Sequence, residues 1–214
     1  MYKLQNAARS SASFRVRIAL NLKGLPFEYI PIGLAQGEHL QPAFADSVPA
    51  AALVPVLHTA DGLQLTQSMA IMEWLDGTHP DTAPLLPTDL LGKTRVRALA
   101  QMIACEIHPL NNLRVLKYLK HDLAQPQAAV DTWYRHWVEG GLRDFEKAVT
   151  LTCGQYCYGD ALTMADVCLV PQIFNGQRFN CDFSGLPNTL RVFDNLMKLP
   201  AFEQAQPKHC PDFV

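Results

Sequence analysis

The chain has 214 residues, a formal net charge of −2, 49% apolar residues and 18% charged residues. This composition is too apolar for a disordered protein and too varied for a fibre, and the near-neutral charge argues against general binding of nucleic acid. The length suits one large domain or two small ones, and no apolar run approaches the roughly 18 residues of a membrane span. Residues 1–6 also lack the apolar core of a secretion signal. We therefore expect a cytoplasmic protein with no membrane partner and no nucleic-acid partner.

The first eighty residues alternate between short strands and helices. Residues 2–4 form a plausible strand, apolar residues recur at helical spacing over 14–22, and Gly24 is typical of a helix end. Residues 27–32 form a second strand, and a strand, helix and strand joined this tightly predict a parallel βαβ unit.

A hairpin is predicted next, after a short helix near residues 40–45. The apolar runs 53–58 and 63–66 flank Asp61 and Gly62, a strong hairpin signal, and a helix follows over 68–79. The resulting order, βαβ, helix, ββα, is that of a thioredoxin-like domain.

Helical patterns dominate the rest of the chain. Residues 80–90 hold three prolines and read as a linker. Helices are predicted over 92–120, with a break at His108 and Pro109, over 127–150, and over 189–198, stopped by Pro200. Thr163 and Asp166 have the spacing of a capping box that opens another helix. We predict an α/β thioredoxin-like domain over 1–82, a linker over 83–90 and an all-α domain over 91–214.

Two stretches of the chain are rich in bases and poor in acids. Residues 1–27 contain no Asp or Glu, and residues 91–121 contain only Glu106 against six bases. Most of these bases are expected to be ordinary solvated charges, and the alternative is that some converge on an anionic ligand. The six cysteines are scattered without zinc-ligand spacing, so we expect free, reduced thiols and no metal site.

Serines precede both predicted helices of the first domain. Ser10 and Ser11 lie before the first helix, where free backbone N–H groups and the helix dipole favour a thiolate or another anion. Gln67 and Ser68 lie before the later helix, where a carboxylate is a natural ligand. Simple N-caps are the alternative for both, favoured for the first pair and about equally good for the second.

Other candidates are less specific. Val54-Pro55 opens a strand, and its peptide isomer stays open from sequence. The polar residues from His108 to Arg114 interrupt a helix and either line a cleft or satisfy freed backbone groups. Arg178 has the side chain best suited to bidentate carboxylate binding, although one exposed arginine is usually just solvated.

Residues 10–20 resemble the Ser-Ser-Cys-x-x-Arg-Val-Arg-Ile-Ala-Leu signature of zeta-class glutathione transferases. That class includes the maleylacetoacetate and maleylpyruvate isomerases. Weaker matches follow in the family's order at 53–57, 67–71, 163–166 and 169–172. The resemblance implies the glutathione transferase fold, a homodimer, and glutathione in the first domain with substrate in a cleft beneath the second.

The resemblance also assigns roles to individual residues. Ser10 matches the serine that activates the glutathione sulfur, and Ser11 follows it at the helix start. Arg178 matches an arginine that binds a substrate carboxylate, and Arg9 and Arg114 are the expected further partners of a dicarboxylate. The positions matched to glutathione binding or the lining of the site are Ser10, Ser11, His39, Val54, Pro55, Gln67, Ser68, His108 and Asn112.

The implied reaction is the glutathione-dependent isomerisation of maleylacetoacetate to fumarylacetoacetate in aromatic amino acid catabolism. Maleylpyruvate isomerisation in the gentisate pathway is the alternative, as is a broader transferase that conjugates electrophiles or α-halo acids. A non-catalytic binding protein is disfavoured by the intact Ser-Ser and Gln-Ser motifs. Ala12 stands where the signature has cysteine, which disfavours reactions that need a mixed disulfide with the enzyme.

Overall fold

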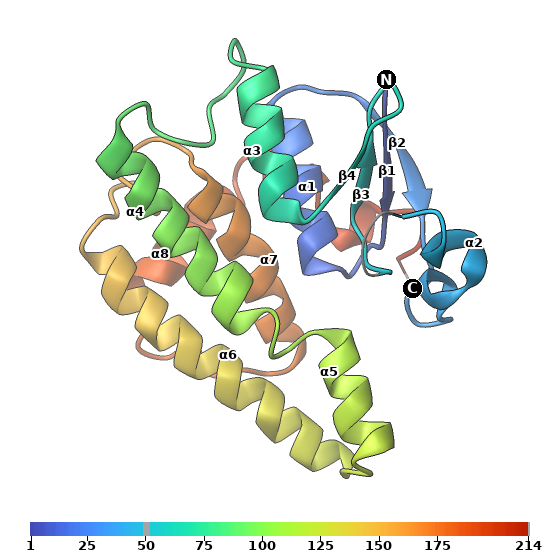
Figure 1. Cartoon of the computed structure of the whole chain (residues 1–214). Helices are drawn as coiled ribbons and strands as arrows, with labels where there is room; N and C mark the ends of the chain where they lie inside the picture. Colours follow the sequence, from blue (N-terminus) through green and yellow to red (C-terminus); the bar gives the residue numbers. More distant parts are fainter. Residues whose placement is uncertain (49–51, 214) are drawn as a thin grey trace. The chain divides into compact units, whose positions relative to one another are not determined.

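A computed structural model describes residues 1–48 and 52–213, which form two compact units (Figure 1). The first unit comprises residues 1–85 and 199–214, and the second comprises residues 86–198. The elements of the first unit are β1 (Tyr2–Asn6), α1 (Ser11–Leu22), β2 (Phe27–Pro31), the 3-10 helix η1 (Glu38–Leu40), α2 (Pro42–Ala45), β3 (Val56–His58), β4 (Gln64–Thr66), α3 (Ser68–Thr78), α9 (Pro200–Gln204) and the 3-10 helix η4 (Pro207–His209).

The first unit has the predicted thioredoxin-like order. Its four-stranded sheet runs β2-β1-β3-β4, with β1 parallel to β2 and antiparallel to β3, and β3 antiparallel to β4. In Figure 1, α1 and α3 lie together on one side of this sheet and α2 lies on the other. The βαβ unit and the hairpin predicted from sequence are both confirmed.

Glycines end two elements of this unit where the sequence predicts it. Gly24 follows α1 with φ +64° and Gly62 turns the β3–β4 hairpin with φ +89°, conformations that cost other residues free energy. Local turn chemistry therefore decided both boundaries.

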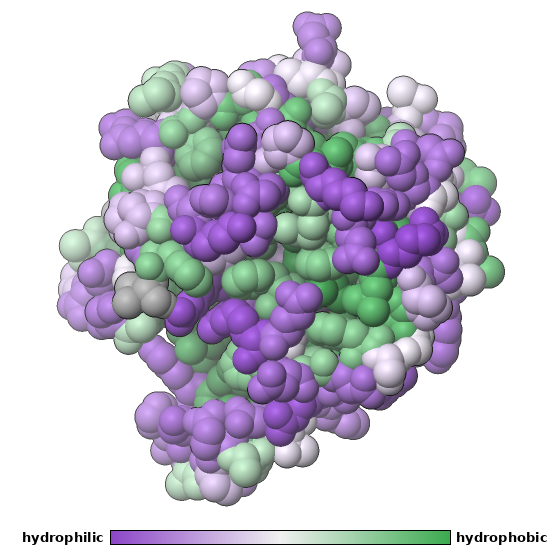
Figure 2. Space-filling view, turned by 180° about the vertical axis from the view of Figure 1, so that it is seen from behind, coloured by the Kyte–Doolittle hydropathy of each residue, from purple (hydrophilic) through white to green (hydrophobic). Residues whose placement is uncertain are grey.

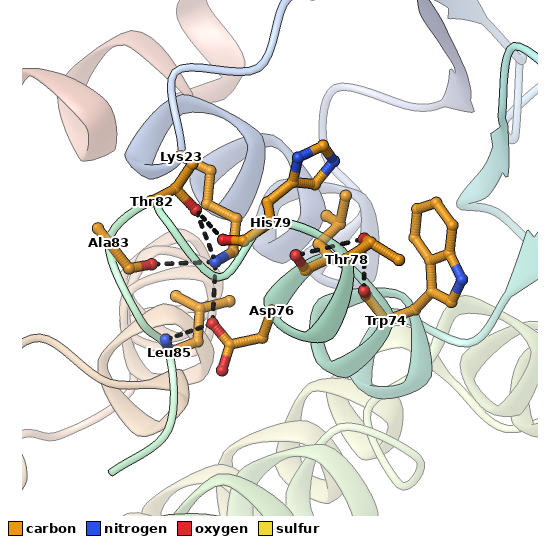
Figure 3. A network of polar contacts seen from close by, with 9 residues as sticks. Lys23, Trp74, Asp76, Thr78, His79, Thr82, Ala83 and Leu85 are labelled. Carbon is orange, nitrogen blue, oxygen red and sulfur yellow. Dashed lines mark hydrogen bonds and ion pairs between the residues drawn. The ribbon is translucent and has the colours of Figure 1, made fainter. Parts of the chain in front are cut away.

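A buried lysine anchors the segment that leaves α3 (Figure 3). The Lys23 ammonium donates to Asp76 Oδ1 at 2.8 Å, to Thr82 Oγ1 at 3.1 Å and to the Ala83 carbonyl at 3.0 Å. Asp76 Oδ1 also accepts from the Leu85 N–H at 2.8 Å. Residues 83–85, which the sequence assigned to the linker, are thereby held within the first unit.

Replacing Lys23 with methionine is expected to destabilise the protein by about 2 kcal/mol. The Lys23 side chain is 0% exposed and that of Asp76 is 16% exposed, so the orphaned carboxylate regains only part of its hydration. Urea unfolding measures the loss. Lys147→Met, which breaks a pair of largely exposed side chains, is the matched control and should leave the midpoint almost unchanged. Equal midpoints for the two variants would contradict the proposed anchoring.

The end of the chain corrects the predicted domain ranges. Residues 199–214 were assigned to the second domain but belong to the first unit. Arg17 Nε donates to the Ala205 carbonyl at 3.0 Å, and Asn21 Nδ2 donates to the Ala201 carbonyl at 3.1 Å. Pro200, predicted only to stop a helix, is the first residue of α9. These two hydrogen bonds join residues that are 188 and 180 positions apart in the sequence. No local sequence pattern reveals such contacts.

The second unit is helical throughout its regular structure. Its elements are α4 (Leu90–Gln101), the π-helical segments η2 (Met102–Ile107) and η3 (Tyr118–Asp122), α5 (Leu113–Lys117), α6 (Gln127–Thr150), α7 (Met164–Arg178) and α8 (Pro187–Leu196). The predicted break at His108 and Pro109 is confirmed, as is the helix over 127–150. Thr163 and Asp166 form the predicted capping box, with the Thr163 N–H donating to Asp166 Oδ2 at 2.8 Å.

The surface mixes hydrophilic and apolar residues on the face seen in Figure 2. Among the described residues, no helix is both long enough and apolar enough to cross a membrane. All six cysteines are free thiols.

Candidate functional site

The first candidate element is the N-terminus of α1. Ser10 caps the helix, because its Oγ accepts a hydrogen bond from the Ser13 N–H at 3.2 Å. A serine hydroxyl that accepts one bond still has its own proton to donate, so the cap and a donor role are compatible. Ser10 is partly exposed, Ser11 is 3% exposed, and the first turn contains no acidic residue that would repel an anion.

The second candidate element is the N-terminus of α3. Gln67 holds φ at +66°, a left-handed value that is unfavourable for a residue other than glycine. Ser68 begins the helix, is 5% exposed, and its Oγ accepts a hydrogen bond from Arg15 Nη1 at 3.3 Å. The geometry combines free helical N–H groups, a hydroxyl and a guanidinium, which is a suitable set for a carboxylate.

Sheet topology places these two helix ends on the same side of the first unit. Since β1 and β4 are each antiparallel to β3, they run in the same direction, and α1 and α3 each follow the carboxyl end of one of them. The bond from Arg15 to Ser68 joins the two helices directly. Residues 53 positions apart are thus brought together.

The remaining candidates of the first unit lie on its loops. The Val54-Pro55 peptide is cis, which answers the question that the sequence left open. Val54 is 9% exposed and belongs to an apolar cluster with Phe44 and Val56. His39 lies in η1 and is partly buried, and Arg9 is exposed with its guanidinium carbon 5.2 Å from the centre of the Phe213 ring.

The candidates of the second unit fall into two groups. Asn112 caps α5 after the helix break, its Oδ1 accepting from the N–H of the exposed Arg114 at 3.1 Å, and His108 ends η2. Arg178 is the exposed last residue of α7, and its Nη1 donates to Asn175 Oδ1 at 3.0 Å. Arg178 also lies 5.9 Å from the Phe179 ring, which stacks on Tyr134.

Two hollows, one in each unit, are lined by residues other than these candidates. One of about 300 Å³ is lined by Gln5, Ile32 and Phe44, among others. Another of about 220 Å³ is bordered by Glu106, Asp144 and Trp137. Its two carboxylates make the second hollow unsuitable for an anionic substrate. Among residues 1–48 and 52–213, no cluster of three His, Cys, Asp or Glu side chains is arranged to hold a metal ion.

Comparison with known proteins identifies the family to which the chain belongs. The family model of the glutathione S-transferase N-terminal domain matches residues 9–78. A probable maleylacetoacetate isomerase of Vibrio cholerae is 44% identical, with 95% of this chain and 94% of the relative aligned. A solved maleylpyruvate isomerase, a bacterial glutathione S-transferase of the zeta class, is 41% identical with a TM-score of 0.94, covering 99% of this chain and 100% of that one. The chain belongs to the zeta-class glutathione S-transferases.

A third relative of this zeta-class chain was solved with glutathione. The maleylacetoacetate isomerase of Anaeromyxobacter dehalogenans, with glutathione bound in its active site, is 39% identical with a TM-score of 0.90, and the match covers 100% of this chain and 98% of that one. The residues of the present zeta-class transferase fit such a ligand. Two helix N-termini at the same end of the sheet provide donors for a thiolate and for a carboxylate, and Arg15 adds a buried cation beside Ser68.

Sequence reasoning missed Arg15. It counted this arginine among the ordinary bases of residues 1–27, yet the side chain is 1% exposed and contacts a candidate site residue. The sequence did offer a signal, because Arg15 matches the first arginine of the signature at residues 10–20. In the structure Arg15 lies within the run from Phe14 to Leu20, whose residues are all buried. A helix buried on nearly every side must also bury its arginines.

Proposed function

We propose that this protein is a glutathione-dependent cis–trans isomerase that converts maleylacetoacetate to fumarylacetoacetate. The observation that carries the proposal is the pairing of two helix N-termini, with Ser10 and Ser11 on one and Gln67 and Ser68 on the other, at the same end of one sheet. Membership of a family of named maleyl isomerases supports the reaction class.

The proposal assigns the thiol and the γ-glutamyl carboxylate of glutathione to residues of the first unit. The Ser10 hydroxyl donates to the sulfur, and the N-terminal dipole of α1 lowers the pKa of a thiol held there. Gln67 and Ser68 bind the γ-glutamyl carboxylate, and the Val54 backbone pairs with the cysteinyl backbone. The chemistry that glutathione supplies when bound is a thiolate whose reversible addition to the cis double bond permits rotation. Further residues assigned to the cofactor are Ser11, His39, Pro55, His108 and Asn112.

Three arginines are proposed to bind the substrate. Arg9, Arg114 and Arg178 provide cations for a small dicarboxylate, and each charge-assisted bond contributes about 1.5–3 kcal/mol. The same cations stabilise negative charge that develops on the substrate during the reaction. We further propose that the protein is cytoplasmic and forms a homodimer. Light scattering of the purified protein would check the dimer.

An assay with two substrates tests the proposal. Maleylacetoacetate and maleylpyruvate are each followed spectrophotometrically, with and without glutathione. Glutathione-dependent turnover that favours maleylacetoacetate supports the proposal. A preference for maleylpyruvate supports the alternative, because the chain is similar to isomerases of both kinds, at 44% and 41% identity. Conjugation of electrophiles without isomerisation would point to a broader transferase, and no activity in any assay would contradict an enzymatic role.

Replacing Arg178 with alanine is expected to raise KM for the maleyl substrate about tenfold, because one charge-assisted hydrogen bond to a carboxylate is lost. Steady-state kinetics at saturating glutathione measures the change. The matched control is Arg95→Ala, which removes an exposed base of α4 that has no proposed role. If Arg178→Ala matched the control in both kcat and KM, Arg178 would be excluded from substrate binding.

A further inference from the structure

Arg15 and Arg17 are two buried arginines on the same helix with opposite surroundings. Arg17 is 2% exposed, and its guanidinium donates to Asn6 Oδ1 and to the carbonyls of Ala7, Ala8 and Ala205 at 2.9–3.3 Å. All three of its nitrogens have acceptors, so Arg17 is explained by the fold itself.

Arg15 is not explained by the fold. Among the described residues it is the largest fully buried side chain, at 1% exposure, and its one hydrogen bond within them joins Nη1 to the Ser68 hydroxyl at 3.3 Å. Within residues 1–48 and 52–213, Nε and Nη2 of Arg15 have no hydrogen-bond partner, and no carboxylate forms an ion pair with it. A buried cation without an anion is costly, so its presence points to an anion that arrives from outside the chain.

We propose that Arg15 is a positioning residue for the γ-glutamyl carboxylate of glutathione, acting through Ser68. The inference rests on the proposed function, since it assumes that glutathione binds at the N-terminus of α3. Arg15 supplies the positive charge that makes this helix end prefer a carboxylate over a neutral group.

The hydrogen-bond direction explains how Arg15 acts at a distance. A guanidinium can only donate, so the Ser68 oxygen accepts from Arg15 and its own O–H proton points elsewhere. The free N–H groups at the start of α3 favour an anion at the same place. Arg15 thus holds the Ser68 hydroxyl as a donor, and the charge behind it strengthens that donor. The left-handed backbone of Gln67, which immediately precedes Ser68, is consistent with strain retained at a binding site.

The test compares two ligands that differ by a single carboxylate. Calorimetric titration measures Kd for glutathione and for 4-aminobutyryl-cysteinylglycine, which lacks the γ-glutamyl carboxylate and keeps the thiol. Arg15→Met is expected to weaken glutathione binding about 10- to 100-fold and binding of the analogue by less than about threefold. A purely structural role for Arg15 would weaken both ligands alike, and such a result would overturn the inference.

Further variants keep the binding test decisive if Arg15→Met does not fold. Arg15→Gln is neutral, keeps a polar side chain and decides the question if Arg15→Met does not fold, because it too should lose the preference for the carboxylate. Arg15→Lys restores the charge and should recover part of that preference. Arg17→Met is the matched control, expected to lower thermal stability without changing the ratio of the two Kd values.

A double-mutant cycle checks the route through Ser68. In a Ser68→Ala background, Arg15→Gln is expected to cost less glutathione affinity than it does alone, because part of its effect is transmitted by the hydroxyl. Full additivity would overturn the proposed route. Failure of the wild-type protein to bind glutathione would instead contradict the proposed function, so the two failures are distinguishable.

Discussion

Replacing Ser10 with glycine is expected to lower kcat/KM of the isomerisation about 10- to 100-fold. The proposed hydroxyl donor to the sulfur is lost, and a hydrogen bond to a charged group contributes about 1.5–3 kcal/mol. Glycine is the informative substitution because Ser10 also caps α1, and glycine at that position costs only a few tenths of a kcal/mol relative to serine. A large loss of activity with little loss of stability therefore reports on the donor.

A pH titration identifies the origin of this loss. Ultraviolet absorbance of the thiolate should show that the pKa of bound glutathione is higher in Ser10→Gly than in the wild type, because a donor to the anion has been removed. The matched control is Ser13→Ala, which alters a buried serine of the same helix without a proposed role in binding. An unchanged thiol titration in Ser10→Gly would remove Ser10 from sulfur activation.

Replacing Glu146 with glutamine is expected to destabilise the protein by about 2–4 kcal/mol. Glu146 lies on α6 and is 8% exposed, and its carboxylate accepts from the backbone N–H groups of Asn188 and Thr189 at 3.1 and 2.8 Å. Asn188 Nδ2 and the Thr189 hydroxyl donate to it as well. This carboxylate caps the N-terminus of α8 from another helix, so the amide would present a donor to a set of donors.

The effect of Glu146→Gln depends on pH. Burial opposes ionisation of Glu146, but the hydrogen bonds from Thr189 and Asn188 outweigh it and lower the pKa of the carboxyl below its usual value. A lowered folded-state pKa contributes stability that is present above the unfolded value of about 4.3 and is lost as the pH falls through the folded pKa. The wild type and the variant should therefore differ most near neutral pH and converge in acid.

Urea unfolding at several pH values, followed by tryptophan fluorescence, measures this difference. The matched control is Glu139→Gln on the same helix, because Glu139 accepts a single exposed hydrogen bond from the Asp182 N–H. The control should lose much less stability than Glu146→Gln. A loss for Glu146→Gln that did not change with pH would show that the interaction is not that of an ionised carboxylate.

Much of the fold could be predicted because neighbouring residues decide it. Asp61 and Gly62 specified the hairpin through turn chemistry, and apolar periodicity gave the full extent of α6, Gln127–Thr150. The pairs Ser10-Ser11 and Gln67-Ser68 were found because helix starts have recognisable capping residues, and in the structure they begin the two helices that follow parallel strands. Their roles in glutathione binding stay predictions.

By itself, the sequence determined the order of the elements, the family signature at residues 10–20 and the candidate residues at helix ends. Tertiary structure alone decided that residues 199–214 join the first unit, that the Val54-Pro55 peptide is cis, and that Arg15 reaches Ser68 across 53 positions. It also decided that Glu146 caps a helix 43 positions away. The physical reason is the separation along the sequence over which each interaction acts. Capping, turns and periodicity act within a few residues, whereas packing between distant segments decides the partners of a buried charge.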